Sequence, residues 1–569
     1  MPDDSVSLGL LRTPLTRRTA LQTGLLGLGG LAATALVGCS SSTSPSVAAK
    51  GGGQSGTLRV ALGTFDEGTY LPNTGSGTRQ TYTSPILEYP YLAGLQKAGL
   101  AQGLMTSLNI SSDGLTISGN VRPGVKFHDG TTLTSADIGN TVDLMISPNS
   151  LVALAPTLRS IIKSIDTSDP STITFHLSSP YAGFPGQLSS YGLFAGVMPK
   201  AYVDRVGQTA ADKHPIGTGP FKFVSQSLDT IELEALTSHW RVVPQFKRLS
   251  LLNVPEASSA VDLLETGGVD IINPDVQSAA SILKSDQVKV FSYPGAYILM
   301  LLFGNDYVQA DKRYTGQQPY SDIRVREAMN VAIDRDAIVK SVYQGYATPA
   351  RIGEFDPLLP ASVKPYAYDP RKAKQLLAAA GYPNGFELTV NSWPFSPGAE
   401  LPDVIQIVSQ YWQQVGIRTK IVPGQYASFR PKWFAGQAPG QVFGISGAGY
   451  ETGWQSWAER FYGTNSPIAV YESTAFNNYI TQWGNEVSAA AQAASAKQFA
   501  MDCYNNFTEI GLAVADGLYI ANKNTVANFT PPAQWYEQYY EYTQRNPATD
   551  TVTKYTPEPY PQWEAISGV

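Results

Sequence analysis

Alternation of apolar and polar residues predicts several β-strands along the chain. Residues 57–62, 115–122 and 172–177 place an apolar side chain at about every second position. A side-chain period of two is typical of a strand that buries one face. The pair Pro123-Gly124 that follows the second segment favours a tight turn. We therefore expect ordered structure to begin at the first of these segments.

Two other segments repeat their apolar residues with the period of an α-helix. The first opens at Ser321 or Asp322, a candidate N-cap, and its expected buried face consists of Val325, Ala328, Met329, Ala332 and Ile333. The second opens at Asp369-Pro370 and ends at Gly381, and its expected buried face consists of Ala373, Leu376, Leu377 and Ala380. Both patterns predict helices that lie on a core.

A strand–helix–strand succession follows in the second half of the chain. Apolar runs at 386–390 and 417–422 predict strands, and 403–415 predicts a helix stopped by Gly416, with an apolar face of Val404, Ile407, Val408, Tyr411 and Trp412. Such a succession is typical of a parallel α/β unit, in which ligands bind beyond the carboxyl ends of the strands. This points to Asn391-Ser392-Trp393 and to the loop after Val422.

The beginning of the chain has the features of an export signal. Arg17-Arg18 precedes an apolar run, Leu25 to Val37, of about 13 residues. That is short for a bilayer span, which needs about 20 residues. A basic region, a short apolar region and small residues before Cys39 are typical of a signal peptide, which we predict over 1–38.

The tetrad Leu36-Val37-Gly38-Cys39 resembles a bacterial lipobox, in which the cysteine becomes the mature N-terminus and carries lipid. The alternative is a chance cysteine in an ordinary secretory signal. The arginine pair resembles a twin-arginine signal, and the general secretory route stays open. Residues 39–55 are rich in Ser, Ala and Gly, as in a flexible tether. We expect a protein anchored by lipid at the extracytoplasmic face of the cell membrane.

Composition narrows the possible functions. The chain has 46 acidic and 40 basic residues and no basic stripe, so we expect no nucleic-acid partner. If Cys39 is lipidated, the second cysteine, Cys503, has no partner for a disulfide, and we expect it to be a buried apolar side chain. We predict no metal site and no cofactor, because no second ligand stands at helical spacing from any of the four histidines, His128, His176, His214 and His239.

Four segments, in this order, carry a family resemblance. They are Val121-Arg122-Pro123-Gly124-Val125-Lys126-Phe127-His128-Asp129-Gly130 with the helix start Leu133 to Ile138; Ile216-Gly217-Thr218-Gly219-Pro220-Phe221-Lys222 with Trp240; Asp322 to Ala328 with Ala332-Ile333-Asp334-Arg335 and Gly345; and Tyr368-Asp369-Pro370 with Ala373, Leu376-Leu377, Ala380-Gly381-Tyr382 and Gly385-Phe386. Together they resemble extracellular solute-binding protein family 5, which includes dipeptide-, oligopeptide- and nickel-binding proteins.

The resemblance implies an α/β fold of the periplasmic-binding-protein type II, with two lobes, a hinge and an extra domain in a three-domain, cluster C-like arrangement. Gly217, Gly219 and Pro220 are expected to form a rigid crossover between domains. The implied ranges are 56–94 with 214–303 and 515–569 for domain I, 95–213 for domain II, and 304–514 for domain III.

The function implied by the resemblance is capture of a small solute, in the first place a peptide, and its delivery to the permease subunits of an ABC transporter. A nickel chelate, an oligosaccharide or an opine stays open as the solute. The lobes are expected to close around it. We expect a monomer without catalytic residues.

The expected ligand-binding residues are aromatic, with one acid among them. Peptide-binding members of the family carry a segment like glycine-tryptophan-x-x-aspartate-tyrosine-proline, whose aspartate holds the peptide's α-amino group. The matching stretch here, 447–457, offers Glu451 at a shifted spacing. Glu451 would bind an amine, whereas a neutral solute would depend on Trp454. The aromatic residues expected to face the ligand are Tyr297, Trp393, Tyr450, Trp454 and Trp457.

Two functions of other classes compete with this interpretation. A secreted hydrolase is disfavoured because Gly444-Ile445-Ser446-Gly447-Ala448 lacks the final glycine of a nucleophile elbow and no histidine lies in the last third of the chain. A glycosidase with a carboxylate pair stays open, because acids are too common to exclude it. A purely structural surface lipoprotein is the other alternative. Turnover assays and saturable binding would separate these classes.

Overall fold

The computed structural model describes residues 54, 56–65, 68–74, 79–93, 100–152, 155–181, 183–189, 196–304, 318–395, 397–447, 454–462, 470–471, 473–484, 486, 489–529, 540 and 543–545. All of these belong to one unit, 49–569. The predicted signal peptide, Cys39 and the predicted tether, apart from Gln54, lie outside the described residues.

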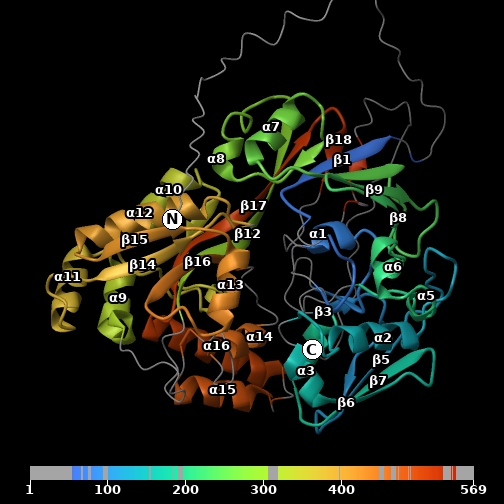
Figure 1. Ribbon diagram of the computed structural model, residues 1–569, viewed down its shortest axis with the longest axis horizontal. Helices are drawn as coiled ribbons and strands as arrows, with labels where there is room; N and C mark the ends of the chain where they lie inside the picture. Colours follow the sequence, from blue (N-terminus) through green and yellow to red (C-terminus); the bar gives the residue numbers. More distant parts are fainter. Residues whose placement is uncertain are drawn as a thin grey trace, which may run out of the picture. The chain divides into compact units, whose positions relative to one another are not determined.

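An eleven-stranded mixed sheet organises this unit (Figure 1). Its order is β15-β14-β16-β12-β17-β11-β1-β10-β9-β8, and β13 pairs with β17 outside this path. The strands are β1 Thr57–Leu62, β8 Phe221–Gln226, β9 Thr230–Ala235, β10 Arg248–Asn253, β11 Ile271–Ile272, β12 Val288–Phe303, β13 Ala347–Pro349, β14 Glu387–Ser392, β15 Arg418–Pro423, β16 Gln441–Gly447 and β17 Ile510–Asn522.

The long antiparallel strands β12 and β17 connect the two halves of this sheet. The strand β11 pairs with β17 at one end, and β16 pairs with β12 at the other. Between these attachments, within the described residues, β12 pairs only with β17, and their register shifts between Tyr293 and Tyr297. The strand β17 also pairs with β13 at Ala515, and the Asp516 amide donates to the Tyr346 carbonyl at 2.9 Å. Gly295 lies in this shift with φ +70°. We call this two-stranded part, residues 291–296 and 516–519, the neck.

Parallel strands lie on both sides of the neck. On one side β1 is parallel to β10 and β11. On the other, β14 is parallel to β15 and β16. The helix α12, Leu401–Gln414, connects β14 to β15, so the predicted parallel α/β unit is confirmed. Gly385 can only be glycine here, because a Cβ would lie 1.8 Å from the Gly416 carbonyl oxygen.

The two capped helices are also confirmed, with small differences. Asp322 caps α9, Ile323–Val331, and Asp369 caps α11, Pro370–Ala379. Leu376 and Ala380 are only half-buried, whereas the other residues of the two predicted faces are buried. The helix α9 ends before Ala332, because Asp334 caps a further helix, α10, Arg335–Val342.

A second, four-stranded sheet has the order β4-β5-β7-β6. The predicted strands at 115–122 and 172–177 are its β5 and β7, and both alternate buried with exposed or half-buried residues. None of the helices in the described part of the chain has both the length and the apolar character to cross a bilayer. Cys503 is fully buried, as expected.

The remaining elements are short strands and helices that surround the two sheets. The strands are β2 Tyr91–Ala93, β3 Leu100–Gln102, β4 Asn109–Ile110, β5 Thr116–Asn120, β6 Ile162–Asp166, β7 Thr172–Leu177, β18 Val526–Asn528 and β19 Gln544–Arg545. The helices are α1 Gln80–Thr83, α2 Ser135–Met145, α3 Ala155–Ile161, α4 Phe184–Gln187, α5 Lys200–Val206, α6 Gln208–Lys213, α7 Ala257–Glu265, α8 Val276–Ala279, α13 Tyr426–Phe434, α14 Trp454–Tyr462, α15 Thr474–Gly484 and α16 Ala489–Asn506, with 3-10 turns at Pro319–Ser321 and Asp356–Leu358.

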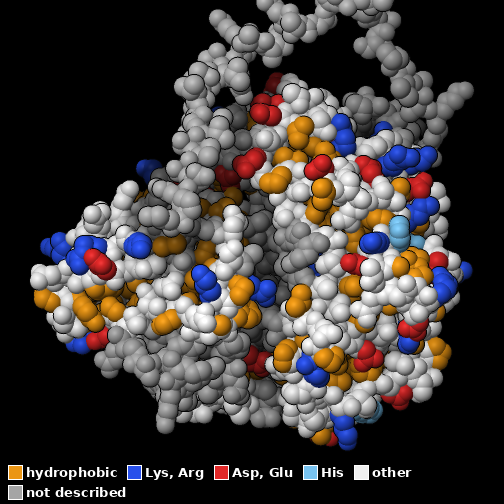
Figure 2. Space-filling view, viewed as in Figure 1, with side chains coloured by type: hydrophobic (Ala, Val, Ile, Leu, Met, Phe, Trp, Pro, Cys, Tyr) orange, Lys and Arg blue, Asp and Glu red, His pale blue; other side chains and the backbone are white. Residues whose placement is uncertain are grey.

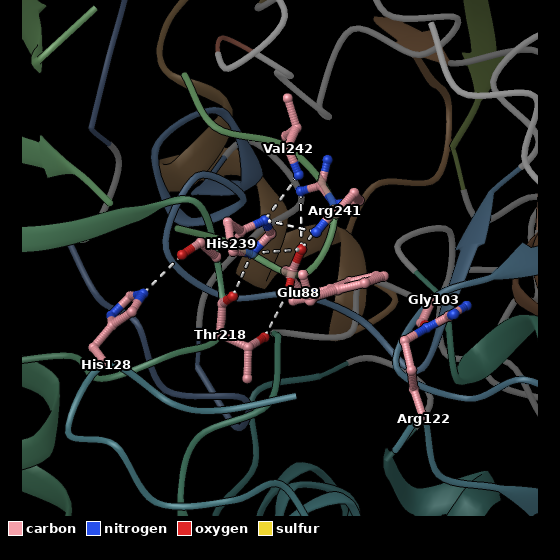
Figure 3. Close-up of polar contacts among 10 residues, drawn as sticks. Glu88, Gly103, Arg122, His128, Thr218, His239, Arg241 and Val242 are labelled. Atoms are coloured by element: carbon pink, nitrogen blue, oxygen red, sulfur yellow. Dashed lines mark hydrogen bonds and ion pairs between the residues drawn. The ribbon is translucent and has the colours of Figure 1, made fainter. Parts of the chain in front are cut away.

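Glu88 lies at the centre of a buried polar cluster (Figure 3). Its carboxylate accepts hydrogen bonds from the Thr218 hydroxyl at 2.8 Å and from the Trp240 indole at 2.7 Å. Arg241 forms an ion pair with it at 2.9 Å. Burial alone would raise the pKa of Glu88, but Arg241 and His239 beside it lower that pKa to about 2. The cluster therefore holds a charged carboxylate without access to water.

Two of the four resemblance segments meet at this cluster. The Arg122 guanidinium lies 4.8 Å from the centroid of the Trp240 ring, within cation–π range. His128 contacts the Gly219 carbonyl oxygen at 2.9 Å through Nε2. The matching residues of these segments therefore support one another in the core, which explains why they identify a fold.

The predicted crossover at Gly217 and Gly219 is closely packed. The Gly219 amide donates to the Ile86 carbonyl at 2.9 Å, so residues 85–87 and 217–221 run side by side. A Cβ on Gly219 would lie 2.4 Å from the Pro85 carbonyl oxygen. The role of this crossover as a hinge, and the predicted domain boundaries, stay predictions.

We predict that Gly219→Val lowers the free energy of unfolding by about 1–3 kcal/mol, the usual cost of overpacking. The matched control is Gly186→Val, because a Cβ on Gly186 meets no atom within 4 Å. Urea denaturation of the two variants measures the difference. Equal midpoints for both variants would contradict the crowding at residue 219.

The Glu88 cluster predicts a pH dependence. Because the folded pKa of Glu88 is lowered to about 2, its stabilising contribution is present above the pKa of the unfolded chain and is lost as the pH falls toward 2. Glu88→Gln should lower the free energy of unfolding at pH 7 by about 3–5 kcal/mol, since Arg241 stays buried without a counter-charge. It should also flatten the loss of stability below about pH 4, near the ordinary glutamate pKa.

Denaturation curves between pH 7 and pH 3 check both effects. The control is Glu234→Gln, which removes an ion pair between exposed side chains, Lys222 and Glu234, and should change stability little. An acid-sensitivity in Glu88→Gln equal to that of the unaltered protein would refute this account.

Candidate functional site

A cavity of about 450 Å³ lies where the parallel strands on both sides of the neck end. Ligands bind at this position in open α/β sheets, because connecting loops diverge there. In the space-filling view the surface is hollowed between α1 and α13 (Figure 2). Thr81 of α1 and Gln425, the N-cap residue of α13, line the cavity. The lining residues are Val60, Ala61, Leu62, Gly63, Thr64, Thr81, Val254, Pro255, Ala257, Ala260, Ile271, Ile272, Asn273, Pro274, Asp275, Pro394, Phe395, Ala399, Gln425, Tyr519 and Tyr540.

The cavity combines apolar walls with a few polar groups. Strand residues of β1 and β11 supply aliphatic side chains, and Phe395, Tyr519 and Tyr540 supply aromatic rings. Thr64, Thr81, Asn273, Asp275 and Gln425 are the polar side chains of the lining. Sites for small organic ligands have this mixture, in which apolar area contributes affinity and a few polar groups fix orientation. Asp275 is the single charged residue in this lining.

A smaller cavity of about 70 Å³ lies against the neck and shares lining residues with the first. We call it the acidic chamber. Its lining residues are Asn273, Pro274, Asp275, Val276, Tyr297, Phe395, Pro397, Gly398, Ala399, Glu400, Asp516, Gly517 and Leu518. Tyr297 comes from β12, Asp516 from β17, and Glu400 stands at the N-terminus of α12.

Glu400 turns into the protein instead of capping its helix. It occupies the N-cap position of α12 but makes no side-chain cap hydrogen bond. Its Oε1 accepts a hydrogen bond of 2.9 Å from the Tyr297 hydroxyl. Burial raises the pKa of Glu400, against the opposing effect of the Tyr343 and Tyr297 hydroxyls, and Asp275 raises it further. Burial and Glu400 also raise the pKa of Tyr297 well above its usual range.

Charged side chains do not form a band on the face seen in Figure 2, where lysines and arginines alternate with acids. Within the described part of the chain, no three His, Cys, Asp or Glu side chains are grouped so that they could hold a metal ion. The two cavities described above are places among the described residues that can receive a solute.

The aromatic residues predicted to face the ligand lie in different environments. Tyr297 lines the acidic chamber. Trp393 is 2 % exposed and packs against Phe429 with ring centroids 5.0 Å apart, while the two residues after it, Pro394 and Phe395, line the larger cavity. Trp457 stacks on Phe461 in α14 at 4.5 Å and lines neither cavity.

The structure does not describe the side chains of the other three predicted ligand residues. Tyr450 and Glu451 lie outside the described residues, and Trp454 begins α14 with a side chain that is also outside them. A part in ligand binding for any of the six residues stays a prediction.

A family model for bacterial extracellular solute-binding proteins, family 5, matches residues 99–466. The chain belongs to this family. The match covers all four resemblance segments, from Val121 through Phe386, and thereby confirms the family that the motifs indicated.

Relatives in family 5 carry different ligand names. The glutathione-binding protein GsiB of Pectobacterium atrosepticum is 31% identical over 323 residues, 56% of this chain and 60% of that protein. The heme-binding protein A of Haemophilus influenzae is 30% identical over 375 residues, 60% of this chain and 65% of that protein. The chain thus spans less than two thirds of the length of these relatives.

Solved structures confirm the fold predicted from the family 5 motifs. The periplasmic binding protein DppA of Helicobacter pylori, in complex with the peptide STSA, has a TM-score of 0.69 and 21% identity, covering 86% of this chain and 98% of that one. At this identity the likeness concerns the fold alone. The predicted α/β binding-protein fold is therefore correct.

Several cavity residues escaped the sequence interpretation. Phe395 and Gln425 lie within three residues of the ends of β14 and β15, and a part of Trp393 in ligand binding stays a prediction. Asp275 follows β11, a strand of two residues that the pattern did not predict. Glu400 precedes a helix, a position where acids are common, so only the structure distinguishes it from a cap.

Proposed function

We propose that this protein is the substrate-binding component of an ABC importer, and that its solute is a short peptide bound in the cavity of about 450 Å³. The cavity at the strand ends is the observation that supports this function most directly. Its volume lies in the usual range for small-ligand sites, about 300–1,000 Å³. The protein acts without turnover, as a monomer, and passes the solute to the permease subunits.

The relatives favour a peptide over the other solutes. One bears the name of a glutathione-binding protein, and a protein of the same fold holds the peptide STSA. The lining fits such a solute, because apolar and aromatic walls suit side chains while Asn273, Gln425 and the strand ends offer partners for amide groups. A heme-binding relative makes haem the second solute to test.

Closure of the two sides around the solute is part of this proposal. The lining comes from both sides of the neck, so solute contacts are complete only when the sides approach each other. A solute that contacts both sides stabilises the closed state and shifts the population toward it. The neck and the crossover at 85–87 and 217–221 are the connections that would absorb this movement.

The location follows from the beginning of the chain. We propose export, by the twin-arginine route, and lipidation of Cys39, which places the protein at the extracytoplasmic face of the membrane. Residues 39–55 then act as a tether long enough to let the folded unit meet the permease.

Phe395→Ala should weaken peptide binding about tenfold or more, because this ring lines both cavities. The matched control, Phe434→Ala, removes a half-buried ring on α13 that lines neither cavity. Native mass spectrometry of the purified protein identifies any solute carried along, and calorimetry with a panel of di- to pentapeptides, glutathione and haem measures affinity. Hydrolysis of a bound peptide, or saturable binding of haem but of no peptide, would overturn the proposal.

Cys39→Ala should release the protein from the membrane fraction into the soluble extracytoplasmic fraction, since a lipid chain and its thioether cannot form without the thiol. Immunoblots of fractionated cells measure this distribution, and Cys503→Ala is the control for general loss of a cysteine. Equal membrane retention of Cys39→Ala and the unaltered protein would show that the anchor is elsewhere.

A further inference from the structure

Basic side chains lie where the folded unit begins, at Gly56. The Gly56 carbonyl accepts hydrogen bonds from the amide of Lys247 at 3.1 Å and from that of Arg248 at 3.3 Å. A Cβ on Gly56 would lie 4.0 Å from a guanidinium nitrogen of Arg545. We call Lys247, Arg248 and Arg545 the collar. The predicted tether, 39–55, therefore joins the folded unit beside three basic residues.

Pairing between distant segments builds the collar. The strands β1 and β10 begin side by side, with Thr57 opposite Arg248. Arg545 belongs to β19, and its amide donates to the Gln245 side chain at 2.9 Å. Its guanidinium lies 5.7 Å from the centroid of the Phe246 ring. Two parts of the chain thus supply positive charge at one end of the sheet.

The acids near the collar are engaged with other residues. Glu234, which pairs with Arg248 between β9 and β10, forms an ion pair with Lys222 at 3.1 Å. Lys222 lowers the pKa of Glu234, and Lys247 and Arg248 lower it further. Glu232 accepts a hydrogen bond of 2.6 Å from a serine hydroxyl of β10. The two exposed residues of the collar, Lys247 and Arg248, form no ion pair with any residue that the structure describes.

The sequence that leads to the collar is basic as well. Between Cys39 and Asp66 it contains Lys50 and Arg59 and no acid. Arg59 is neutralised by an ion pair with Asp270 at 3.0 Å, so Lys50 adds to the charge of the collar. The whole chain has a net charge of −6. The collar is therefore a positive region on an acidic protein, at the place where the chain leads toward its proposed anchor.

A lipid anchor makes a weak attraction to the membrane effective. Each lysine or arginine beside an anionic membrane surface raises affinity about fivefold, the equivalent of about 1 kcal/mol, so three raise it about a hundredfold. This attraction extends only about 8 Å at physiological salt. The tether 39–55 has an expected root-mean-square length of about 20–25 Å, which keeps the collar close to the surface. Proximity then converts a weak contact into a populated one.

The collar and the larger cavity lie at opposite ends of β1. Thr57 begins this strand beside the collar, whereas Leu62, Gly63 and Thr64 line the cavity. A membrane that contacts the collar therefore leaves the cavity uncovered. The net negative charge of the chain disfavours contact of the other faces with an anionic surface.

We propose that the collar rests on the phosphate head groups of an anionic membrane and orients the tethered protein with its cavity open to solute. Lys247, Arg248 and Arg545 donate to phosphate oxygens, as lysine and arginine commonly do. This inference rests on the proposed lipidation of Cys39. It is independent of which solute the cavity takes.

The test uses the lipidated protein in phosphatidylcholine vesicles with and without phosphatidylglycerol, an anionic lipid. A dye on an introduced cysteine reports its distance from acceptor dyes in the head groups by energy transfer, and the buried Cys503 is not labelled. Val243→Cys places the dye between β9 and β10, at the collar end, and Leu228→Cys places it in the β8–β9 turn, at the opposite end. Both side chains are exposed. Transfer from position 243 should rise in the anionic vesicles, and transfer from position 228 should not.

A charge-removing variant tests the residues themselves. Lys247→Ala combined with Arg248→Ala should lower the ratio of surface-bound to free orientation at least tenfold, because two of three charges are lost. The matched control is Arg371→Ala combined with Lys374→Ala, which removes two exposed charges from α11. Molar salt should release the unaltered protein from the surface while the lipid keeps it on the vesicle.

Equal transfer in neutral and anionic vesicles overturns the inference, and so do equal effects of the collar and control variants. In either case the protein still binds its solute in calorimetry, and the proposed function survives. If the vesicles do not retain the protein at all, it carries no lipid, and the proposed anchoring fails together with this inference.

Discussion

The antiparallel ladder between β12 and β17 is the constraint on which the arrangement depends. It carries one set of parallel strands at each end, and both sets direct their carboxyl ends toward the same cavity. The eight residues from Ala296 to Phe303 are all buried, as expected of a strand covered on both faces. The pairing of these two strands therefore determines which side chains meet at the site, although few of the lining residues belong to β12 or β17.

Two buried glutamates show how differently the same side chain can be used. Glu88 has an arginine, a hydroxyl and an indole as partners, and its pKa is lowered to about 2. Glu400 accepts a hydrogen bond from the Tyr297 hydroxyl and is also stabilised by the Tyr343 hydroxyl, but burial raises its pKa. The first carboxylate is saturated by the protein and stabilises the junction of two segments. The second has neutral hydroxyl donors instead of a counter-charge, and it lines a cavity.

The sequence predicted the fold more fully than the site, for identifiable reasons. The caps Asp322 and Asp369 act over a few residues, so local pattern was enough to locate their helices. The motif residues around Trp240 identified the family because they pack together in the core, and for that reason they carry no information about the ligand.

The site depends instead on contacts between distant segments. Glu400 meets Tyr297 across 103 positions of sequence, and no local pattern reports such a contact. Trp393 was the reasonable aromatic choice at the end of β14, but the chain turns there, burying Trp393 and presenting Phe395 to the cavity. Which of two neighbouring rings faces a ligand depends on that turn.

The neck also has a mechanical consequence. Two-stranded ribbons are twisted more strongly than wide sheets. We therefore expect a change in the twist of the eleven-stranded sheet to fall mainly at residues 291–296 and 516–519, where the register shifts. The Gly295 amide, at the register shift, is held by the carboxylate of Asp516, which borders the acidic chamber. One side chain, Asp516, therefore both borders the chamber and holds the backbone of the neck where its register changes.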